Sequence, residues 1–150
     1  MISSSAPTAE VLVASSLDEH LAVRHRVFVE LQGLFAESDV DSWDARAETL
    51  HAVAVVDGAV VGTVRLYPLG DGLWKGDRLA VLPDARVHRL GAALVQFAVR
   101  TAGSLGGARM VAQVQTTNVR FFERLGWTCD GEAALYHGAP HQPMAIDLDP

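Results

Sequence analysis

The sequence of 150 residues is 49% apolar and carries a formal net charge of −6, and we expect residues 1–150 to form a single domain. An acidic chain lacks the basic surface that non-specific nucleic-acid binding needs, and no run approaches the roughly 18 to 20 apolar residues of a membrane span, so neither partner is expected. The single cysteine, Cys129, excludes an intrachain disulfide and suits a reducing compartment, so we expect a cytoplasmic protein.

A helix is the first element that the sequence predicts. Residues 1–8 lack the basic and apolar regions of a signal peptide and are expected to be flexible. Asp18 can cap a helix whose apolar residues fall near helical spacing. These residues are Leu21, Val27, Phe28 and Leu31. The acidic stretch 33–48 that follows predicts a long loop with a short helix.

A β-hairpin comes next. Residues 51–56 are apolar and β-branched, Asp57-Gly58 is a strong two-residue turn, and residues 59–67 predict the return strand. Glycines in residues 70–76 mark a further turn. Residues 77–82 then predict a short strand that ends before a proline.

The second half of the chain predicts two helices and three strands. Residues 91–102 have the apolar spacing of an amphipathic helix, and residues 110–115 alternate as in a strand. Asn118 opens a short helix with a buried stripe of Phe121, Phe122 and Leu125. The last two strands are predicted over 127–131 and 143–148. This order predicts an α/β sandwich around a mixed sheet.

The segment 78–94 carries the clearest chemistry, because it predicts a strand, a basic turn and the start of a helix. The first turn of a helix leaves backbone N–H groups without partners and carries partial positive charge, which suits a diphosphate. Arg86, His88 and Arg89 add positive charge, and Gly91 lets the backbone approach a phosphate. The alternative is a plain connection with solvated arginines.

This turn resembles the acetyl-CoA signature of the GNAT superfamily of N-acetyltransferases, Arg/Gln-x-x-Gly-x-Gly/Ala. Arg86 is at its first position and Gly91 at its last, while Arg89 replaces the first glycine. Residues 118–127 resemble the GNAT pattern Asn-x-x-x-x-Tyr-x-x-x-Gly-Phe, with one residue fewer between Asn118 and the position of the tyrosine.

Two further stretches are similar to the ElaA-like branch of that superfamily. Residues 24–32 resemble Arg-x-x-Val-Phe-Val-x-Glu-Gln, with Leu31 in place of the glutamate. Residues 138–144 match Gly-x-Pro-His-x-x-Met. The motifs occur in the same order as in that branch and span most of the chain.

The resemblance implies a GNAT-like, mostly antiparallel mixed sheet flanked by helices, with acetyl-CoA as co-substrate and no metal. It implies that the backbone N–H groups of Leu79 and Val81 face the pantetheine arm. Asn118 would orient that arm, or would cap a helix, or both. The diphosphate would lie on the amides of Val87, His88, Arg89, Leu90, Gly91 and Ala92.

The proton carriers are less clearly marked. Many GNAT enzymes protonate the leaving thiolate with a tyrosine, but Phe122 stands at that position here. Tyr136 is the nearest replacement, unless it is a surface tyrosine of a turn. His141 is the favoured base, unless it is structural. Other candidate bases are His51, Glu37, Asp39 and Asp77.

The predicted reaction is transfer of an acetyl group to a primary amine, on a small molecule or a peptide. We expect Arg24, Glu37 and Asp39 to bind this substrate, although the acidic stretch could equally be a solvated loop. One alternative is an enzyme similar to acyl-homoserine lactone synthases, which share this core. Another is a domain that binds CoA or a partner without turnover. The sequence is also compatible with a homodimer.

Overall fold

The computed structural model describes residues 9–14 and 18–150, except the side chains of residues 86–88, so the predicted flexible lead 1–8 lies outside it. The strands are β1 (Ala9–Val13), β2 (Leu50–Val56), β3 (Ala59–Gly70), β4 (Leu73–Val81), β5 (Arg109–Gln115), β6 (Thr128–Cys129), β7 (Ala134–Tyr136) and β8 (Ala139–Asp147). The helices are α1 (Asp18–Arg24), α2 (Leu90–Ser104) and α3 (Val119–Arg124), with a π-helix η1 (His25–Leu31) and the 3-10 helices η2 (Ser42–Ala45), η3 (Pro83–His88) and η4 (Thr116–Asn118).

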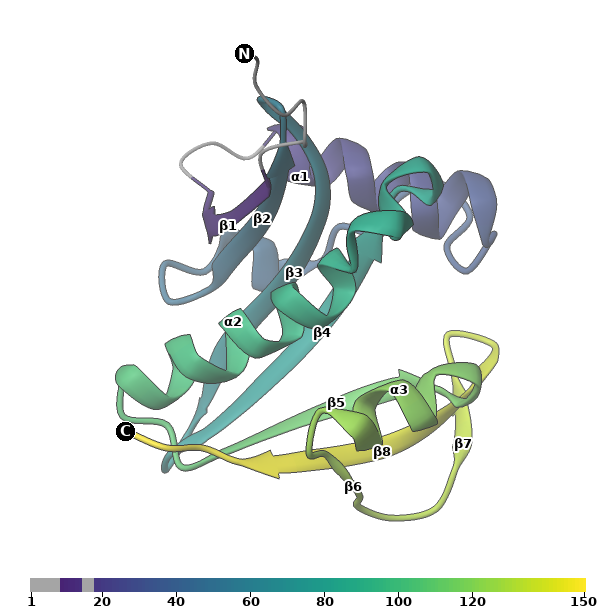
Figure 1. Cartoon of the computed structure of the whole chain (residues 1–150). Coiled ribbons are helices and arrows are strands. Elements are labelled where there is room, and N and C mark those ends of the chain that lie inside the picture. The colour runs from purple at the N-terminus through teal and green to yellow at the C-terminus, as the bar shows by residue number, and fades with distance from the viewer. Residues whose placement is uncertain (1–8, 15–17) are drawn as a thin grey trace.

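The described strands form one sheet in the order β1-β2-β3-β4-β5-β8-β6, with β7 paired to β8. Within it β4 and β5 run parallel, and the other paired strands run antiparallel. Figure 1 shows α2 crossing the strands β2 to β4 and α3 lying over β5 and β8. The predicted α/β fold, with a mixed and mostly antiparallel sheet flanked by helices, is confirmed.

Two hydrophobic cores hold the helices to the sheet. The larger core packs α2 against β2, β3 and β5, with Leu66, Leu94 and Met110 almost fully buried. The smaller core packs Val27 and Phe28 against Ala80 of β4. Because neighbouring side chains of a strand point to opposite faces, α1 and η1 cover the face that α2 leaves free.

The hairpin of β2 and β3 is confirmed, and the acidic stretch 33–48 contains the short helix η2. The strand predicted over 77–82 was too short, because β4 begins at Leu73 and Gly76 lies inside it. The strands β1 and β7 were missed. Leu31, one of the apolar residues near helical spacing, is 44% exposed, because the wider π-helix η1 turns it away from the sheet.

The sheet opens between β4 and β5. Only Leu73–Lys75 pair with Arg109–Val111, and beyond these residues the two strands separate. Arg78 has a positive φ of 53° where the register between β3 and β4 shifts, which marks a bulge. Bulges bend a strand and increase its twist, which is consistent with β4 turning away from β5 here. In Figure 1 the two halves join near the C-terminus and diverge towards the hairpin of β7 and β8.

Candidate functional site

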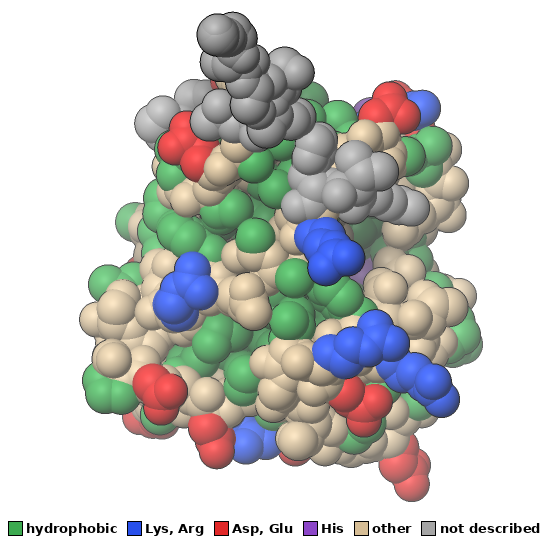
Figure 2. All heavy atoms as spheres, in the orientation of Figure 1, with side chains coloured by type: hydrophobic (Ala, Val, Ile, Leu, Met, Phe, Trp, Pro, Cys, Tyr) green, Lys and Arg blue, Asp and Glu red, His purple; other side chains and the backbone are tan. Residues whose placement is uncertain are grey.

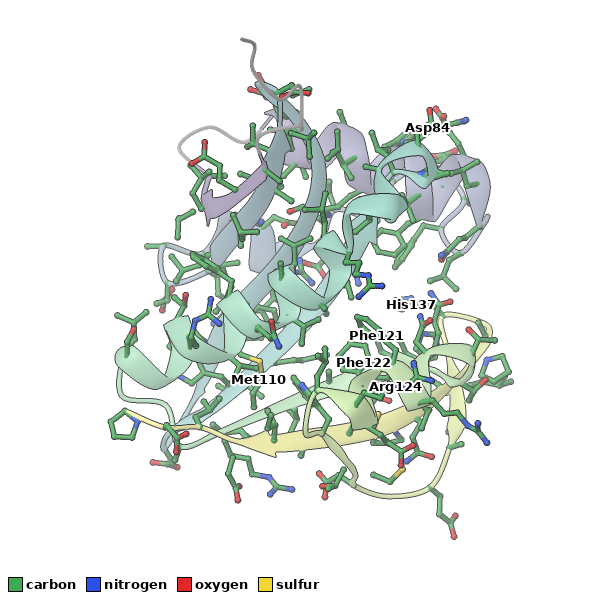
Figure 3. The ribbon with its side chains drawn as sticks, in the orientation of Figure 1. Asp84, Met110, Phe121, Phe122, Arg124 and His137 are labelled. Atoms are coloured by element: carbon green, nitrogen blue, oxygen red, sulfur yellow. The ribbon has the colours of Figure 1, made fainter. Side chains whose placement is uncertain are left out.

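The separated ends of β4 and β5 enclose a hollow of about 790 Å³, counted with its open mouth, which we call the cleft. Its inner wall is apolar and consists of Val64, Val95, Ala98, Met110, Phe122 and Trp127. Its outer wall includes Phe35, Asp77, Arg78, Gln113, Tyr136, His137 and His141. Figure 3 shows Met110 near the closed end, Phe122 on α3, and His137 on the β7–β8 hairpin.

A second hollow, which we call the groove, adjoins the cleft at the start of α2. Both hollows are lined by Leu79, Gln115 and Asn118, so one ligand can extend from the groove into the cleft. Arg89 and Arg124 line the groove. Figure 2 shows basic side chains on both sides of the space between α2 and α3, while most acidic side chains lie along the margins of that face. The surroundings of the groove therefore favour an anionic ligand.

The backbone of β4 offers hydrogen-bond donors to this ligand. The amide of Leu82 donates to the carbonyl oxygen of Val61 at 2.8 Å, so it points towards β3. Successive amides of a strand point to alternate edges, which directs those of Leu79 and Val81 towards the edge that β5 has left. Both residues line the groove.

The start of α2 is the predicted diphosphate site. Arg89 precedes the helix with φ 55° and ψ 36°, a left-handed conformation, and its side chain is exposed. This conformation favours a glycine at this position. Because the side chain of Arg89 is exposed, it does not crowd the turn. Gly91 and Ala92 line the groove, and Leu90 is buried beneath it. The side chains predicted at 86–88, Arg86, Val87 and His88, lie outside the described part.

Asn118 has the position that the motif predicts. It is the last residue of η4 and directly precedes α3, is exposed, and makes no side-chain capping hydrogen bond to the helix. Its amide group is therefore not engaged in the capping role and can contact a ligand where the cleft meets the groove. Phe122 is buried and packs edge to face against Trp127, with ring centroids 5.3 Å apart.

Tyr136 and His141 both line the cleft. His141 is 4% exposed, and its Nδ1 lies 2.8 Å from the carbonyl oxygen of Ala139. A carbonyl oxygen only accepts, so this hydrogen bond places the proton on Nδ1 and leaves the lone pair on Nε2. That is the tautomer a base needs. The predicted polar loop is instead the β7–β8 hairpin, with positive φ at His137 and Gly138 in its turn.

Two of the predicted substrate-binding residues are buried in an ion network. Arg24 is fully buried and binds Asp39 at 2.6 Å and Asp44 at 2.7 Å. Burial disfavours its charge, but the hydrogen bonds to Asp44 and Asp39 more than compensate, so the pKa of Arg24 is raised. Asp39 is 3% exposed. Glu37 is exposed and does not line the cleft or the groove.

The same network extends to the sheet through two more arginines. Arg65 binds Asp77 at 2.7 Å and Asp41 at 2.6 Å, and Arg78 binds the backbone oxygen of Asp39 at 3.0 Å. Asp41 also caps η2. The network thus fastens the loop 33–48 to β3 and β4, beside the cleft.

The other candidate bases are less suited to proton transfer. Asp77 lines the cleft, but both of its carboxylate oxygens accept hydrogen bonds from Arg65. His51 lies outside the cleft and the groove and stacks on His20 at 4.1 Å. Burial, assisted by the neighbouring His20, lowers the pKa of His51 to about 4. In the described ranges, no cluster of three or more His, Cys, Asp or Glu side chains could hold a metal ion.

Two contacts that the sequence did not predict cross the open side of the sheet. The ring of Phe35 lies 4.5 Å from that of His137, which joins the acidic loop to the β7–β8 hairpin. The side chain of Gln115 donates to that of Gln32 at 3.0 Å. The apolar pair Leu34-Phe35 inside an acidic stretch was the available signal for the first contact.

Comparison with known proteins agrees with this geometry. A family model described as "Acetyltransferase (GNAT) family" matches residues 17–127. A Bacillus subtilis (strain 168) protein, named as a candidate acetyltransferase, is 30% identical over 140 residues, which are 91% of this chain and 95% of that protein. No helix within the described ranges is long and apolar enough to cross a membrane.

Solved structures share the fold. A candidate N-acetyltransferase from Lactobacillus plantarum has a TM-score of 0.83 at 24% identity, covering 93% of this chain and 98% of that one. Escherichia coli ElaA has a TM-score of 0.78 at 21% identity, covering 93% and 98%. The CoA-dependent acyl-homoserine lactone synthase BjaI, solved with SAM and isopentyl-CoA, has a TM-score of 0.73 at 24% identity, covering 87% and 75%.

Proposed function

Since the chain belongs to the acetyltransferase (GNAT) family, we propose that it transfers an acyl group, with acetyl-CoA as one donor, to a primary amine on a small molecule or peptide. The observation that carries the proposal is the pair of unpaired backbone amides, of Leu79 and Val81, beside the positive end of α2. An extended pantetheine arm can accept hydrogen bonds from that strand edge while its diphosphate lies at the helix start. We place this activity in the cytoplasm.

The proposed chemistry needs one base and one acid. His141 Nε2 takes a proton from the acceptor amine, directly or through water, as the amine nitrogen bonds to the thioester carbonyl carbon. The amide of Leu79 or Val81 stabilises the oxyanion. The C–S bond then breaks, and the Tyr136 hydroxyl gives its proton to the leaving thiolate. The products are an amide and free CoA; His141 then releases its proton to solvent, and Tyr136 regains one.

An acyl-homoserine lactone synthase-like reaction is the second candidate. The likeness to BjaI shows a shared fold. Dependence on S-adenosylmethionine as the acceptor, in place of a simple amine, would favour it. A domain that binds CoA without turnover is the third candidate, and release of thiol with any amine would exclude it.

A thermal-shift titration with CoA tests the anion site without knowledge of the acceptor. CoA that binds only the folded protein raises the Tm with concentration. Charge reversal by Arg86→Glu or Arg89→Glu should lower the affinity for CoA at least about tenfold, because each removes a cation beside the diphosphate. Arg100→Glu, an exposed site further along α2, is the matched control. Equal effects at all three sites would refute the assignment. An amine panel with thiol detection then tests turnover.

A further inference from the structure

The inner wall of the cleft is built from side chains of the hydrophobic core. Its six apolar residues are each at least nine-tenths buried, with exposures from 1% to 8%. They are Val64, Val95, Ala98, Met110, Phe122 and Trp127. The cleft therefore continues from the acceptor side of the sheet to the core beneath α2.

An unfilled hollow in a core is costly, because the atoms around it lose packing contacts. A buried water molecule is stable only where several polar groups form hydrogen bonds with it, and the apolar inner wall offers few such groups. The acceptor amine is a poor occupant, since a polar or charged group would lose its hydration there. The acyl chain of the donor is apolar, so it is the better occupant of the inner cleft.

The length of the open strand sets the space for such a tail. The last residue of β4 that pairs with β5 is Lys75, and the predicted carbonyl-binding amide belongs to Leu79. Three residues, Gly76 to Arg78, lie between them, which corresponds to about 10 Å of strand at the usual rise per residue. An acetyl methyl group fills only a small part of that length.

Gly76 lies at this end of the cleft, next to Met110. A Cβ atom on Gly76 would lie 3.3 Å from Met110 Sδ, so a side chain would extend towards Met110. The glycine does not have a positive φ, so the strand conformation itself does not require it. Its missing side chain instead lets Met110 lie against β4, so an added side chain would have to displace Met110.

We propose that the inner cleft is an acyl-chain site, and that the protein prefers a donor with a short apolar chain longer than acetyl, of the size of butanoyl or hexanoyl. The proposal rests on the proposed function, because it assigns part of the same cleft to the donor. The carbonyl stays at the amide of Leu79 and the chain extends past Gly76 towards Met110.

Calorimetric binding of CoA, acetyl-CoA, butanoyl-CoA and hexanoyl-CoA, without acceptor, tests the proposal. Two further buried methylene groups should make butanoyl-CoA bind about tenfold more tightly than acetyl-CoA. Ala98→Leu, which fills the inner wall from α2, should bring the butanoyl-to-acetyl affinity ratio close to one. Gly76→Ala narrows the cleft from β4 and should also lower the ratio, which keeps the test decisive if Ala98→Leu does not fold.

Ala102→Leu is the matched control, because Ala102 lies one turn along α2, is fully buried and does not line the cleft. It should lower the Tm by overpacking and keep the wild-type ratio. Equal affinity for acetyl-CoA and butanoyl-CoA in the wild type would overturn the acyl-chain site while leaving CoA binding intact. Absence of binding to every thioester and to CoA would overturn the proposed function as well.

Discussion

The imidazole ring of His141 meets the phenol ring of Tyr136 edge to face, with the ring centroids 5.1 Å apart. Pairing of β7 with β8 sets this relationship, because it places Tyr136 opposite Ala139, the residue whose carbonyl oxygen fixes the tautomer of His141. One hairpin thus carries both proposed proton carriers on the same wall of the cleft. Their proximity allows them to act on one reacting centre.

Replacement of either residue should slow turnover. Tyr136→Phe removes the hydroxyl, and His141→Gln removes the basic nitrogen at similar size, so each should lower kcat by about 10² to 10⁴. Steady-state kinetics with the best amine, and CoA affinity by thermal shift, separate catalysis from binding. His25→Gln, on the exposed side of η1, is the control. Near-normal kcat in both variants would make the hairpin a structural feature.

Gly91→Val should impair CoA binding with little loss of stability. A Cβ at Gly91 would lie 3.5 Å from Phe121, an ordinary contact, so the empty protein can accommodate it. The added branches would instead occupy the space of the ligand at the helix start. In contrast, Gly103→Ala should lower the Tm strongly, because its Cβ would overlap the backbone oxygen of Asp149. Calorimetric CoA binding and thermal melts measure the two effects.

Arg24→Met should destabilise the fold, rather than raise the KM for the acceptor. It removes the buried guanidinium that binds both Asp39 and Asp44, and loss of one partner from a buried ion pair typically costs about 3 to 5 kcal/mol. Glu37→Gln, in the same acidic region but exposed, should change the free energy of unfolding by less than about 0.5 kcal/mol. Urea unfolding measures both. An Arg24→Met protein of wild-type stability with a raised KM would support a substrate-binding role.

Stability should fall as the pH drops from 6.5 towards 4. His51 stays neutral in the folded protein down to about pH 4, whereas the unfolded chain binds that proton near pH 6.5. The unfolded state therefore holds more protons in this window, and stability present above pH 6.5 is lost as the pH falls. The full loss is about 3 kcal/mol. The midpoint of urea unfolding should vary less across this pH window in His51→Gln than in the wild type. In the control His25→Gln, whose side chain is 45% exposed in the wild type, the midpoint should vary as much as in the wild type.

Local patterns predicted much of the fold. The hairpin of β2 and β3 was visible because Asp57-Gly58 imposes a turn between two β-branched runs, and α2 because its apolar spacing is regular. The strand β7 was not visible, because its three residues gain their structure from pairing with β8. The bulge at Arg78 was equally hidden, since an arginine gives no local signal for a positive φ.

Only the local parts of the candidate site could be predicted from the sequence. The turn from Arg86 to Gly91 and the helix start at Asn118 are continuous motifs, so their positions could be read directly. The pairing of Arg24 with Asp39 joins residues 15 apart in the chain, and that of Arg78 with Asp39 joins residues 39 apart. No periodicity connects such partners, so the sequence did not predict that Arg24 and Asp39 would form a buried ion pair.

The gap between β4 and β5 also bears on aggregation. An unpaired strand edge can recruit a strand from another molecule, and natural sheets usually protect their edges with charges, bulges or covering segments. Here the two unpaired edges face each other inside the sheet, and the contact between Phe35 and His137 crosses the opening beside them. A foreign strand would have to pass that contact, whereas a thin, flexible ligand could enter from the groove. The cleft therefore exposes backbone hydrogen-bond donors to a thin ligand but not to a strand of another molecule.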